Sequence, residues 1–455
     1  MANDLASAPA APATVEDAFA RPTQRLPWLQ LLQISIYWFG INAIWGGWEV
    51  LNQEKVPELF GEAMTGRAMF PIEVLGALIA IAVQPTVGCI SDYTMSRWGR
   101  RKPYIAIGAS LDVVFLLGIA TANGPVIFIV FLLLLQFSSN FAQGPFQGYI
   151  PDLVPEDQVG TASALVGMMS TLGVIGGVLF LSFGYRMGED FTIPALLLGG
   201  VEFATAIGTV VFVREGRQAK SRDGRSWVSV ALEAWGTDIL RQRSYTWLLL
   251  SRLFVMAAGA FVVNWAIIWM ERALGFGSDE KGTWVTVILG ATAVATALST
   301  LPAAKVSDHV GRKPVIWVAC AVGAIGVGTF AFAPTIEVAL VAGVLVGIGS
   351  GMFLAVDWAL LSELVPKASS GRYMGMSNLA TALQSVIAVL VGGLILDVVA
   401  NGFLGVQEDF SASARWAIGI GVLFYVVGAI LLIPVKEPAR RRTSGGALAA
   451  VGGAG

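Results

Sequence analysis

Of the 455 residues, 55% are hydrophobic and only 13% are charged. A soluble domain carries about 25% charged residues, because its whole surface must contact water, so this composition excludes an ordinary soluble protein. The net charge of −2 also argues against nucleic acid as a partner, since nucleic-acid-binding proteins usually carry a basic face.

The apolar residues fall into segments long enough to cross the roughly 30 Å hydrocarbon core of a bilayer as helices. Six spans are predicted in the first half, over 28–52, 68–91, 103–122, 125–150, 160–184 and 193–213. Six more are predicted in the second half, over 245–272, 282–305, 314–333, 335–361, 371–400 and 413–435. We therefore expect an all-α integral membrane protein with two six-helix bundles related by a pseudo-two-fold axis.

Polar segments separate and flank these bundles. The stretch from Met1 to Ala20 is rich in Ala and Pro and lacks the basic start and short apolar core of a signal peptide. In chain order we expect a disordered tail, the N-terminal bundle, a basic linker, the C-terminal bundle and a second tail, over 1–27, 28–213, 214–244, 245–435 and 436–455.

Lysine and arginine are concentrated in one set of loops. The tails and the loops after the second, sixth, eighth and tenth spans are rich in them, whereas the other loops are poor in basic residues or mix them with acids. By the positive-inside rule, the basic loops and both termini should lie in the cytoplasm. An even number of spans also requires both termini on one side. These patterns predict a multi-pass protein of the plasma (inner) membrane.

Two motifs recur in both halves. Gly88-Cys-Ile-Ser-Asp92 precedes Arg97-Trp-Gly-Arg-Arg-Lys-Pro103, and the second copy reads Ala304-Lys-Val-Ser-Asp308-His-Val-Gly-Arg-Lys-Pro314. In the same register, Pro151-Asp-Leu-Val-Pro155 matches Ser362-Glu-Leu-Val-Pro366. Two landmarks in register indicate duplication of a six-helix unit. Parallel repeats of this kind are typical of transporters in which two bundles rock about a site at the midplane.

The Ser-Asp…Gly-Arg motif resembles the signature of the major facilitator superfamily, in which it forms a gate latch and does not contact the substrate. The residues support this role, because Asp92 can meet the N-terminus of a neighbouring helix and Arg100 and Arg101 can pair with acids. The alternative is that the basic residues only set the topology. The candidate latch residues are Asp92, Arg100, Arg101, Asp152, Asp308, Arg312, Glu363 and Arg372.

A narrower resemblance rests on the first motif and the end of the fourth span. Val83-Gln-Pro-Thr-Val-Gly88, with four extra residues between Asp92 and Gly-Arg-Arg, is similar to the sucrose-type branch of the glycoside–pentoside–hexuronide cation symporters. Ala142-Gln-Gly-Pro-Phe-Gln-Gly-Tyr-Ile-Pro-Asp152 is similar to the same branch. The resemblance implies transport of a sugar together with a proton or another cation.

One position departs from that branch. Its sucrose carriers hold an arginine five positions before the aspartate of the fourth span, where it serves sugar binding and proton coupling. This chain has Gln147 at that position. Glutamine can hydrogen-bond a hydroxyl but has no charge with which to pair a carboxylate. The resemblance therefore does not extend to sucrose specificity or to that coupling chemistry.

Ionisable side chains within membrane spans are costly and therefore mark candidates for function. Glu49, Glu73 and Asp397 lie near span ends, where they can reach water. Arg252 is early in its span and is expected to extend to the cytoplasmic face. The alternative for deeper acids is a structural polar contact between helices. The candidates for proton coupling are Asp112, Glu202 and Asp357.

Tryptophans and amides on equivalent spans are candidates for a sugar site. A Trp ring can stack on the apolar side of a sugar while Asn and Gln bind its hydroxyls; the alternative is the aromatic belt at the membrane interface. Spans 28–52 and 245–272 are equivalent in the two halves and can face one cavity. The candidate substrate-binding residues are Asn42, Trp45, Trp48, Glu49, Gln143, Gln147, Asn264, Trp265, Asp357 and Trp358.

The sequence shows no catalytic or nucleotide-binding motif, and its single His309 and two separate cysteines predict no metal site. We expect no enzyme activity and no cofactor. The favoured hypothesis is secondary active transport of a small solute, a disaccharide or glycoside, by symport with a proton or sodium ion and alternating access across the lipid bilayer. The alternatives are a facilitator or exporter of another solute and a non-transporting membrane assembly factor.

The expected topology can be tested with reporter fusions at Gly224, in the basic linker, and at Asn123, between the third and fourth predicted spans. Because an odd number of spans separates the two positions, the reporters should lie on opposite sides of the membrane. Alkaline phosphatase and fluorescent-protein fusions measure this directly. Reporters on the same side would contradict the twelve-span arrangement.

Overall fold

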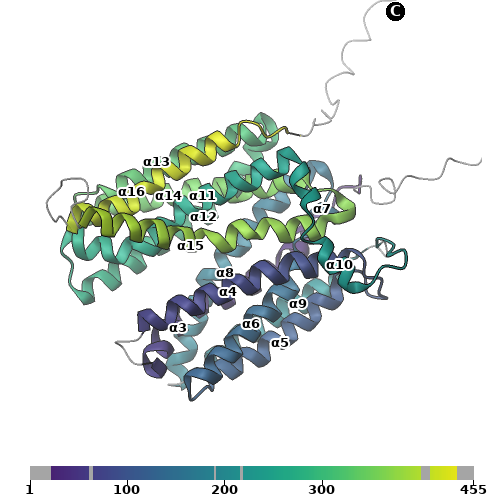
Figure 1. Cartoon of the computed structure of the whole chain (residues 1–455), viewed down its shortest axis with the longest axis horizontal. Helices are drawn as coiled ribbons and strands as arrows, with labels where there is room; N and C mark the ends of the chain where they lie inside the picture. Colours follow the sequence, from purple (N-terminus) through teal and green to yellow (C-terminus); the bar gives the residue numbers. More distant parts are fainter. Residues whose placement is uncertain (1–21, 61–64, 189–190, 216–218, 401–409, 438–455) are drawn as a thin grey trace, which may run out of the picture.

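The computed structural model describes residues 22–60, 65–188, 191–215, 219–400 and 410–437, and this part of the chain is helical, with no strand. Two bundles lie one above the other in Figure 1. The N-terminal bundle contains α2 (Trp28–Ser35), α3 (Tyr37–Phe60), α4 (Thr65–Asp92), α5 (Lys102–Ala120), α6 (Pro125–Phe146), α7 (Tyr149–Leu153), α8 (Val159–Gly188) and α9 (Thr192–Phe212). The C-terminal bundle contains α11 (Arg243–Leu274), α12 (Ser278–Val310), α13 (Arg312–Ala331), α14 (Ile336–Leu364), α15 (Ser370–Ala400) and α16 (Phe410–Leu431).

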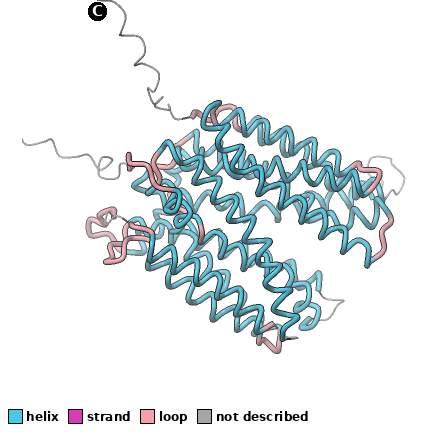
Figure 2. The backbone as a smooth tube through the Cα atoms, turned by 180° about the vertical axis from the view of Figure 1, so that it is seen from behind, coloured by secondary structure: helices cyan, strands magenta, loops and turns pink. Residues whose placement is uncertain are grey.

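Among the described residues, eleven helices are long and apolar enough to cross a membrane. They correspond to the second to twelfth predicted spans. The first predicted span, 28–52, falls on α2 and α3, which a turn at Ile36 separates. The all-α membrane architecture expected from the sequence is confirmed, and Figure 2 shows the long helices joined mostly by short connections.

Small residues let helices within a bundle approach closely, as is usual in membranes. Gly177 of α8 lies against α3, where an added Cβ would be only 2.7 Å from the Gly47 nitrogen. Gly40 of α3 similarly faces α9, and a Cβ there would be 2.8 Å from the Glu202 Cα. These contacts set the position of α3 against α8 and α9.

The two bundles meet mainly where α4 packs against α15 and where α8 packs against α12 and α14. Gly88 of α4 and Gly371 of α15 face each other so closely that a Cβ on either would overlap the carbonyl oxygen of the other. This confirms the expectation that Gly88 allows close helix approach.

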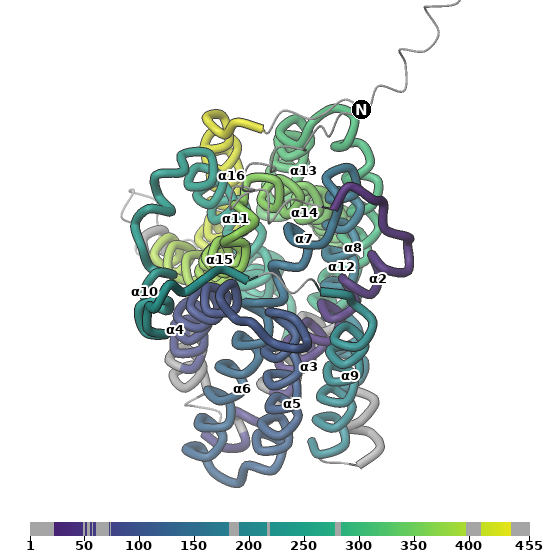
Figure 3. Tube along the Cα trace, turned by 90° about the vertical axis from the view of Figure 1, so that its right-hand side faces the viewer, coloured from purple at the N-terminus to yellow at the C-terminus, as the bar shows by residue number. Residues whose placement is uncertain are grey.

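We call the end of the molecule that carries Asp92, Asp308 and the loops after them the latch end. The described chain ends also lie there, because Arg25 pairs with Asp157 beside α8 and Glu437 accepts the Lys313 N–H. The linker adds a short helix, α10 (Trp227–Glu233), which packs on α4 at this end (Figure 3), followed by the 3₁₀ turn η3 (Thr237–Arg241).

Candidate functional site

Asp92 joins the two bundles at the latch end. Its carboxylate accepts the N–H groups of Gly371 and Arg372, each at 3.1 Å, at the start of α15 in the opposite bundle. The free N–H groups and the dipole of a helix N-terminus stabilise an anion. Asp92 thus lies at the N-terminus of a neighbouring helix, as the sequence predicts.

Arg101 holds Asp92 in place. Its guanidinium is fully buried, pairs with Asp92 at 3.2 Å and with Asp152 at 2.7 Å, and donates to the Ser370 hydroxyl of the opposite bundle at 2.7 Å. Arg100 contacts the same acids, with its Nη2 2.6 Å from Asp152. Two arginines therefore compensate two buried carboxylates.

The second copy of the motif forms the reciprocal contact. Arg312 pairs with Asp308 at 2.7 Å and with Glu363 at 2.9 Å. Asp308 lies beside Gly160 at the start of α8, where a Cβ would be 2.8 Å from the Arg312 Nη1. Each motif aspartate therefore lies against the first turn of a helix in the other bundle. Arg101, not Arg100, is the structural counterpart of Arg312.

Arg372 binds the linker rather than a latch acid. Its guanidinium donates to both Asp238 carboxylate oxygens, at 2.8 and 2.7 Å, and to the Gly236 carbonyl at 3.0 Å. The hydrogen bond from Arg372 lowers the pKa of the Asp238 carboxyl. The linker also meets the latch directly, since the Lys220 N–H donates to the Asp92 carbonyl at 2.9 Å. These contacts attach the linker to the closed latch end.

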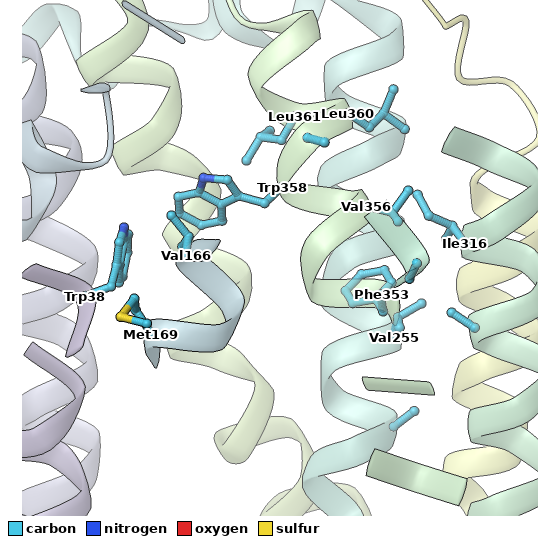
Figure 4. Packing of buried hydrophobic residues seen from close by; sticks show 14 of the residues in the cluster. Trp38, Val166, Met169, Val255, Ile316, Phe353, Val356, Trp358, Leu360 and Leu361 are labelled. Atoms are coloured by element: carbon cyan, nitrogen blue, oxygen red, sulfur yellow. The ribbon is translucent and has the colours of Figure 1, made fainter. Parts of the chain in front are cut away.

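Deeper between the bundles, Trp38 of α3 meets Trp358 of α14, with ring centroids 5.3 Å apart and planes at 86°. Figure 4 shows these two rings on facing helices, with Val166 and Met169 of α8 beside them. Trp38 also packs on Phe146 at the end of α6, at 5.5 Å. Each bundle thus contributes a tryptophan to this contact.

Arg252 of α11 lies beside Trp358 and pairs with Asp357. Both charged side chains are buried, and the guanidinium carbon lies 5.3 Å from the Trp358 ring centroid. The expectation that Arg252 extends to the cytoplasmic face is therefore wrong. A buried carboxylate within reach neutralises the arginine where it stands, so the side chain need not reach water.

Amide side chains connect α4 and α6 close to the interface of the bundles. Gln84 of α4 accepts from Gln147 at 3.0 Å and donates to Gln143 at 3.2 Å and to Asn140. Gln84 also lies against α15, because a Cβ on Gly375 would be 2.6 Å from its carbonyl oxygen. Such amides can exchange these bonds for bonds to a solute hydroxyl.

Two carboxyl groups meet inside the N-terminal bundle, away from any described cation. Asp112 of α5 and Glu202 of α9 are fully buried and lie within hydrogen-bonding distance of each other. The Tyr37 hydroxyl of α3 donates to Glu202 at 3.1 Å, and the Ser138 hydroxyl of α6 donates to Asp112. The other oxygen of each carboxyl group has no donor among the described residues. Four helices converge on this pair.

The other predicted substrate residues make contacts of their own. Trp48 is 6% exposed and stacks on Phe128 inside the N-terminal bundle. Asn42 and Asn264 donate to carbonyls of their own helices, and Trp265 donates to the Ala388 carbonyl of α15 at 2.9 Å. Trp45 is half-buried beside the core. The side chains of Glu49, Glu73 and Asp397 lie outside the part that the structure describes.

Sequence reasoning did not select Tyr37, Trp38, Gln84 or Asn140 for the site. Gln84 stands inside the Val83–Gly88 motif, and Asn140, Gln143 and Gln147 follow an i, i+3, i+7 spacing that places amides on one helix face. The polar stripe on an otherwise apolar helix is the sequence signal that could have identified Asn140. Nothing local distinguishes Tyr37 from other aromatic residues, because its role depends on Glu202 across the bundle.

Two bundles of apolar helices that enclose charged groups and meet through two copies of one motif are typical of a multi-pass membrane transporter. The sequence profile of the Major Facilitator Superfamily matches residues 35–284 and 248–452. The chain belongs to this superfamily, as the motifs indicate, and it is a transporter and not an enzyme.

Two curated relatives differ in their transport activity. A sucrose transport protein of Arabidopsis thaliana is 33% identical over 128 residues, which cover 23% of this chain and 22% of that protein. A multi-drug resistance efflux pump of Streptococcus pneumoniae is 25% identical over 389 residues, which cover 80% of this chain and 86% of the pump. The match to the sucrose transport protein thus spans less than a quarter of its length.

Solved transporters share the fold. A bacterial homologue of the iron transporter ferroportin in an outward-facing state has a TM-score of 0.65 at 13% identity, with 89% of this chain and 98% of that chain covered. The proton:xylose symporter XylE has a TM-score of 0.59 at 15% identity, with 90% and 95% covered. At these identities the likeness establishes the fold alone.

The latch geometry predicts the effect of removing either aspartate. Asp92→Ala and Asp308→Ala should slow transport several-fold while the protein stays folded and solute affinity is largely kept, because both residues lie at the closed end and away from the Trp38–Trp358 contact. Transport rate and binding, measured separately in purified protein, check this. Glu156→Ala, at an exposed acid of the same end, is the control. Lost affinity with normal turnover would contradict the assignment.

The Arg252–Asp357 pair predicts a non-additive effect on stability. Removing one partner should destabilise the protein by about 3–5 kcal/mol, because the other charge stays buried without compensation. Arg252→Met with Asp357→Leu should be less damaging than either single change. Thermal unfolding of the three variants in detergent tests this. Equal or additive losses would show that the two charges do not depend on each other.

Proposed function

We propose that this transporter is a proton-driven sugar symporter that works by alternating access, with the latch end in the cytoplasm. The observation that carries the proposal is the Asp112–Glu202 pair. Two adjacent buried carboxylates repel each other and are poorly solvated, so both cannot be ionised at once. One proton between the two groups removes the repulsion and supplies the donor that their unbonded oxygens lack. The pair is thus suited to bind and release a single proton.

Asp357 is less suited to that role, although the sequence places it with Asp112 and Glu202 as a candidate. Arg252 already neutralises it, so it needs no proton in this arrangement. We assign the Arg252–Asp357 pair to the solute site instead, beside Trp358. A neutral ion pair can present hydrogen-bond donors and acceptors to a polar solute without a net charge.

The proton pair is linked to the solute site through α3. Tyr37 donates to Glu202, and its ring packs on Phe146 with centroids 4.9 Å apart. The next residue, Trp38, packs on the same Phe146 and on Trp358. A change in the proton pair therefore acts on the helix that carries the N-terminal tryptophan of the site. This connection supports coupling between proton and solute.

The chemistry of the site fits a sugar. The indoles of Trp38 and Trp358 offer apolar faces for the C–H side of a pyranose, and the amides of Gln84, Gln143 and Gln147 lie on neighbouring helices to bind hydroxyls. The partial similarity to a sucrose transport protein supports this solute class. The longer similarity to a multi-drug efflux pump supports the second candidate, export of another solute.

Purified protein in proteoliposomes tests the proposal with a panel of labelled mono- and disaccharides, with and without a pH gradient in which the outside is more acidic than the inside. At least one sugar should accumulate under the gradient, and a protonophore should abolish accumulation. If no sugar moves in either direction but a pH gradient drives transport of a lipophilic cation, the result would favour the exporter. No solute-dependent flux would favour an assembly factor.

The proton pair makes a sharper prediction. Asp112→Asn or Glu202→Gln should abolish accumulation against a gradient, because the altered pair no longer exchanges a proton. Sugar exchange at equal concentrations should survive, since exchange needs no net proton movement. Glu337→Gln, at an exposed acid of α14, is the matched control. If both variants still concentrate sugar under a pH gradient, the coupling site lies elsewhere and Asp357 becomes the next to test.

A further inference from the structure

A cavity of about 690 Å³ opens at the latch end between the start of α5 and the end of α9. Its polar wall contains three basic side chains, Arg97, Lys102 and Arg214, and its apolar wall includes Val210 and Val211. It lies at the ends of two membrane-spanning helices, where lipid headgroups meet the protein. The cavity is separate from the Trp38–Trp358 contact and from the proton pair.

The charges of this cavity are unbalanced. Its one acid, Glu215, points inward: its two carboxylate oxygens accept the Arg101 N–H at 3.1 Å each. Among the described residues, no ion pair or side-chain hydrogen bond joins Arg97, Lys102 or Arg214 to another group. Three positive side chains therefore face one cavity whose only acid is already bonded.

The inserted residues of the first motif build part of this wall. Gly99 follows Asp92 by seven positions (99 − 92), whereas Gly311 follows Asp308 by three (311 − 308). The four additional residues bring Arg97 and Trp98 to the cavity. Trp98 is 63% exposed, and a tryptophan in such a place is typical of the membrane interface.

The C-terminal bundle provides an internal comparison. There Glu437 accepts the Lys313 N–H at 2.6 Å, much as Glu215 accepts that of Arg101. The Lys313 ammonium, however, donates to the Ile433 and Val435 carbonyls, each at 2.8 Å. The repeat thus satisfies its lysine internally, so the open basic cavity is a feature of the N-terminal bundle and not of the shared motif.

We propose that this cavity binds the headgroup of an anionic phospholipid, with the phosphate among Arg97, Lys102 and Arg214 and an acyl chain along Val210 and Val211. The charge of the polar wall matches a phosphate, and basic pockets between helix ends on the cytoplasmic side suit anionic headgroups. The apolar wall, exposed at Val211 on the outside of the bundle, distinguishes a lipid from a soluble anion. The proposal does not depend on the transported solute.

Native mass spectrometry of the full-length protein, released from nanodiscs of phosphatidylcholine with a minor fraction of phosphatidylglycerol, tests this. The wild type should retain one phosphatidylglycerol that the Arg97→Gln/Lys102→Gln/Arg214→Gln variant loses, with affinity weakened roughly 100-fold at about 1 kcal/mol per basic residue. The control, Arg241→Gln/Lys305→Gln/Arg243→Gln, removes the same charge from exposed positions of the C-terminal half and the linker and should retain the lipid.

If the triple variant fails to fold, the single variant Lys102→Gln provides the test. Its affinity for phosphatidylglycerol should fall roughly fivefold. Equal loss of lipid in the control variant would show a general effect of charge and overturn the proposal. Displacement of the lipid by inorganic phosphate at a similar concentration would show a simple anion site and overturn the lipid assignment. Retention of phosphatidylglycerol by the folded triple variant would overturn it as well.

Discussion

A charge inside an apolar helical bundle is stable only where another group within a few ångströms compensates it. This protein meets that constraint in three ways. At the latch end, arginines and a helix N-terminus surround Asp92. In the C-terminal bundle, Asp357 is matched by Arg252. In the N-terminal bundle, Asp112 and Glu202 have no described cation and depend on each other. The third arrangement is the one that an added or removed proton changes most.

The two halves therefore differ in chemistry although they share one fold. The repeated motifs give each half the same latch, with an aspartate against the other half's helix start. The charges deep in the two interiors do not repeat among the described residues: the N-terminal half holds the Asp112–Glu202 pair and the C-terminal half holds the Arg252–Asp357 pair. Duplication keeps the contact between the halves the same, while the interiors have diverged; in the proposed symport, the N-terminal half takes the proton and both halves contribute to the solute site.

The sequence was sufficient to predict the spans and the placement of Asp92 at a helix N-terminus, because these depend on local hydropathy and on a motif of fixed spacing. It also marked Asp112 and Glu202 as deep acids, but their contact across α5 and α9 depends on helix rotation, which composition does not determine. Arg252 shows the same limit, since its partner is 105 residues away in the chain. The sequence places Trp48 on a membrane span but does not determine the direction of its side chain, which stacks on Phe128.

The contact between Gly88 and Gly371 brings backbone directly against backbone. At this point the two helix backbones meet with no side chain between them. What must break is a small set of directional bonds, chiefly those from the start of α15 to Asp92. Closely packed interfaces switch between discrete arrangements and do not deform continuously, so this seam favours an abrupt change between two shapes over a continuum of partly opened ones.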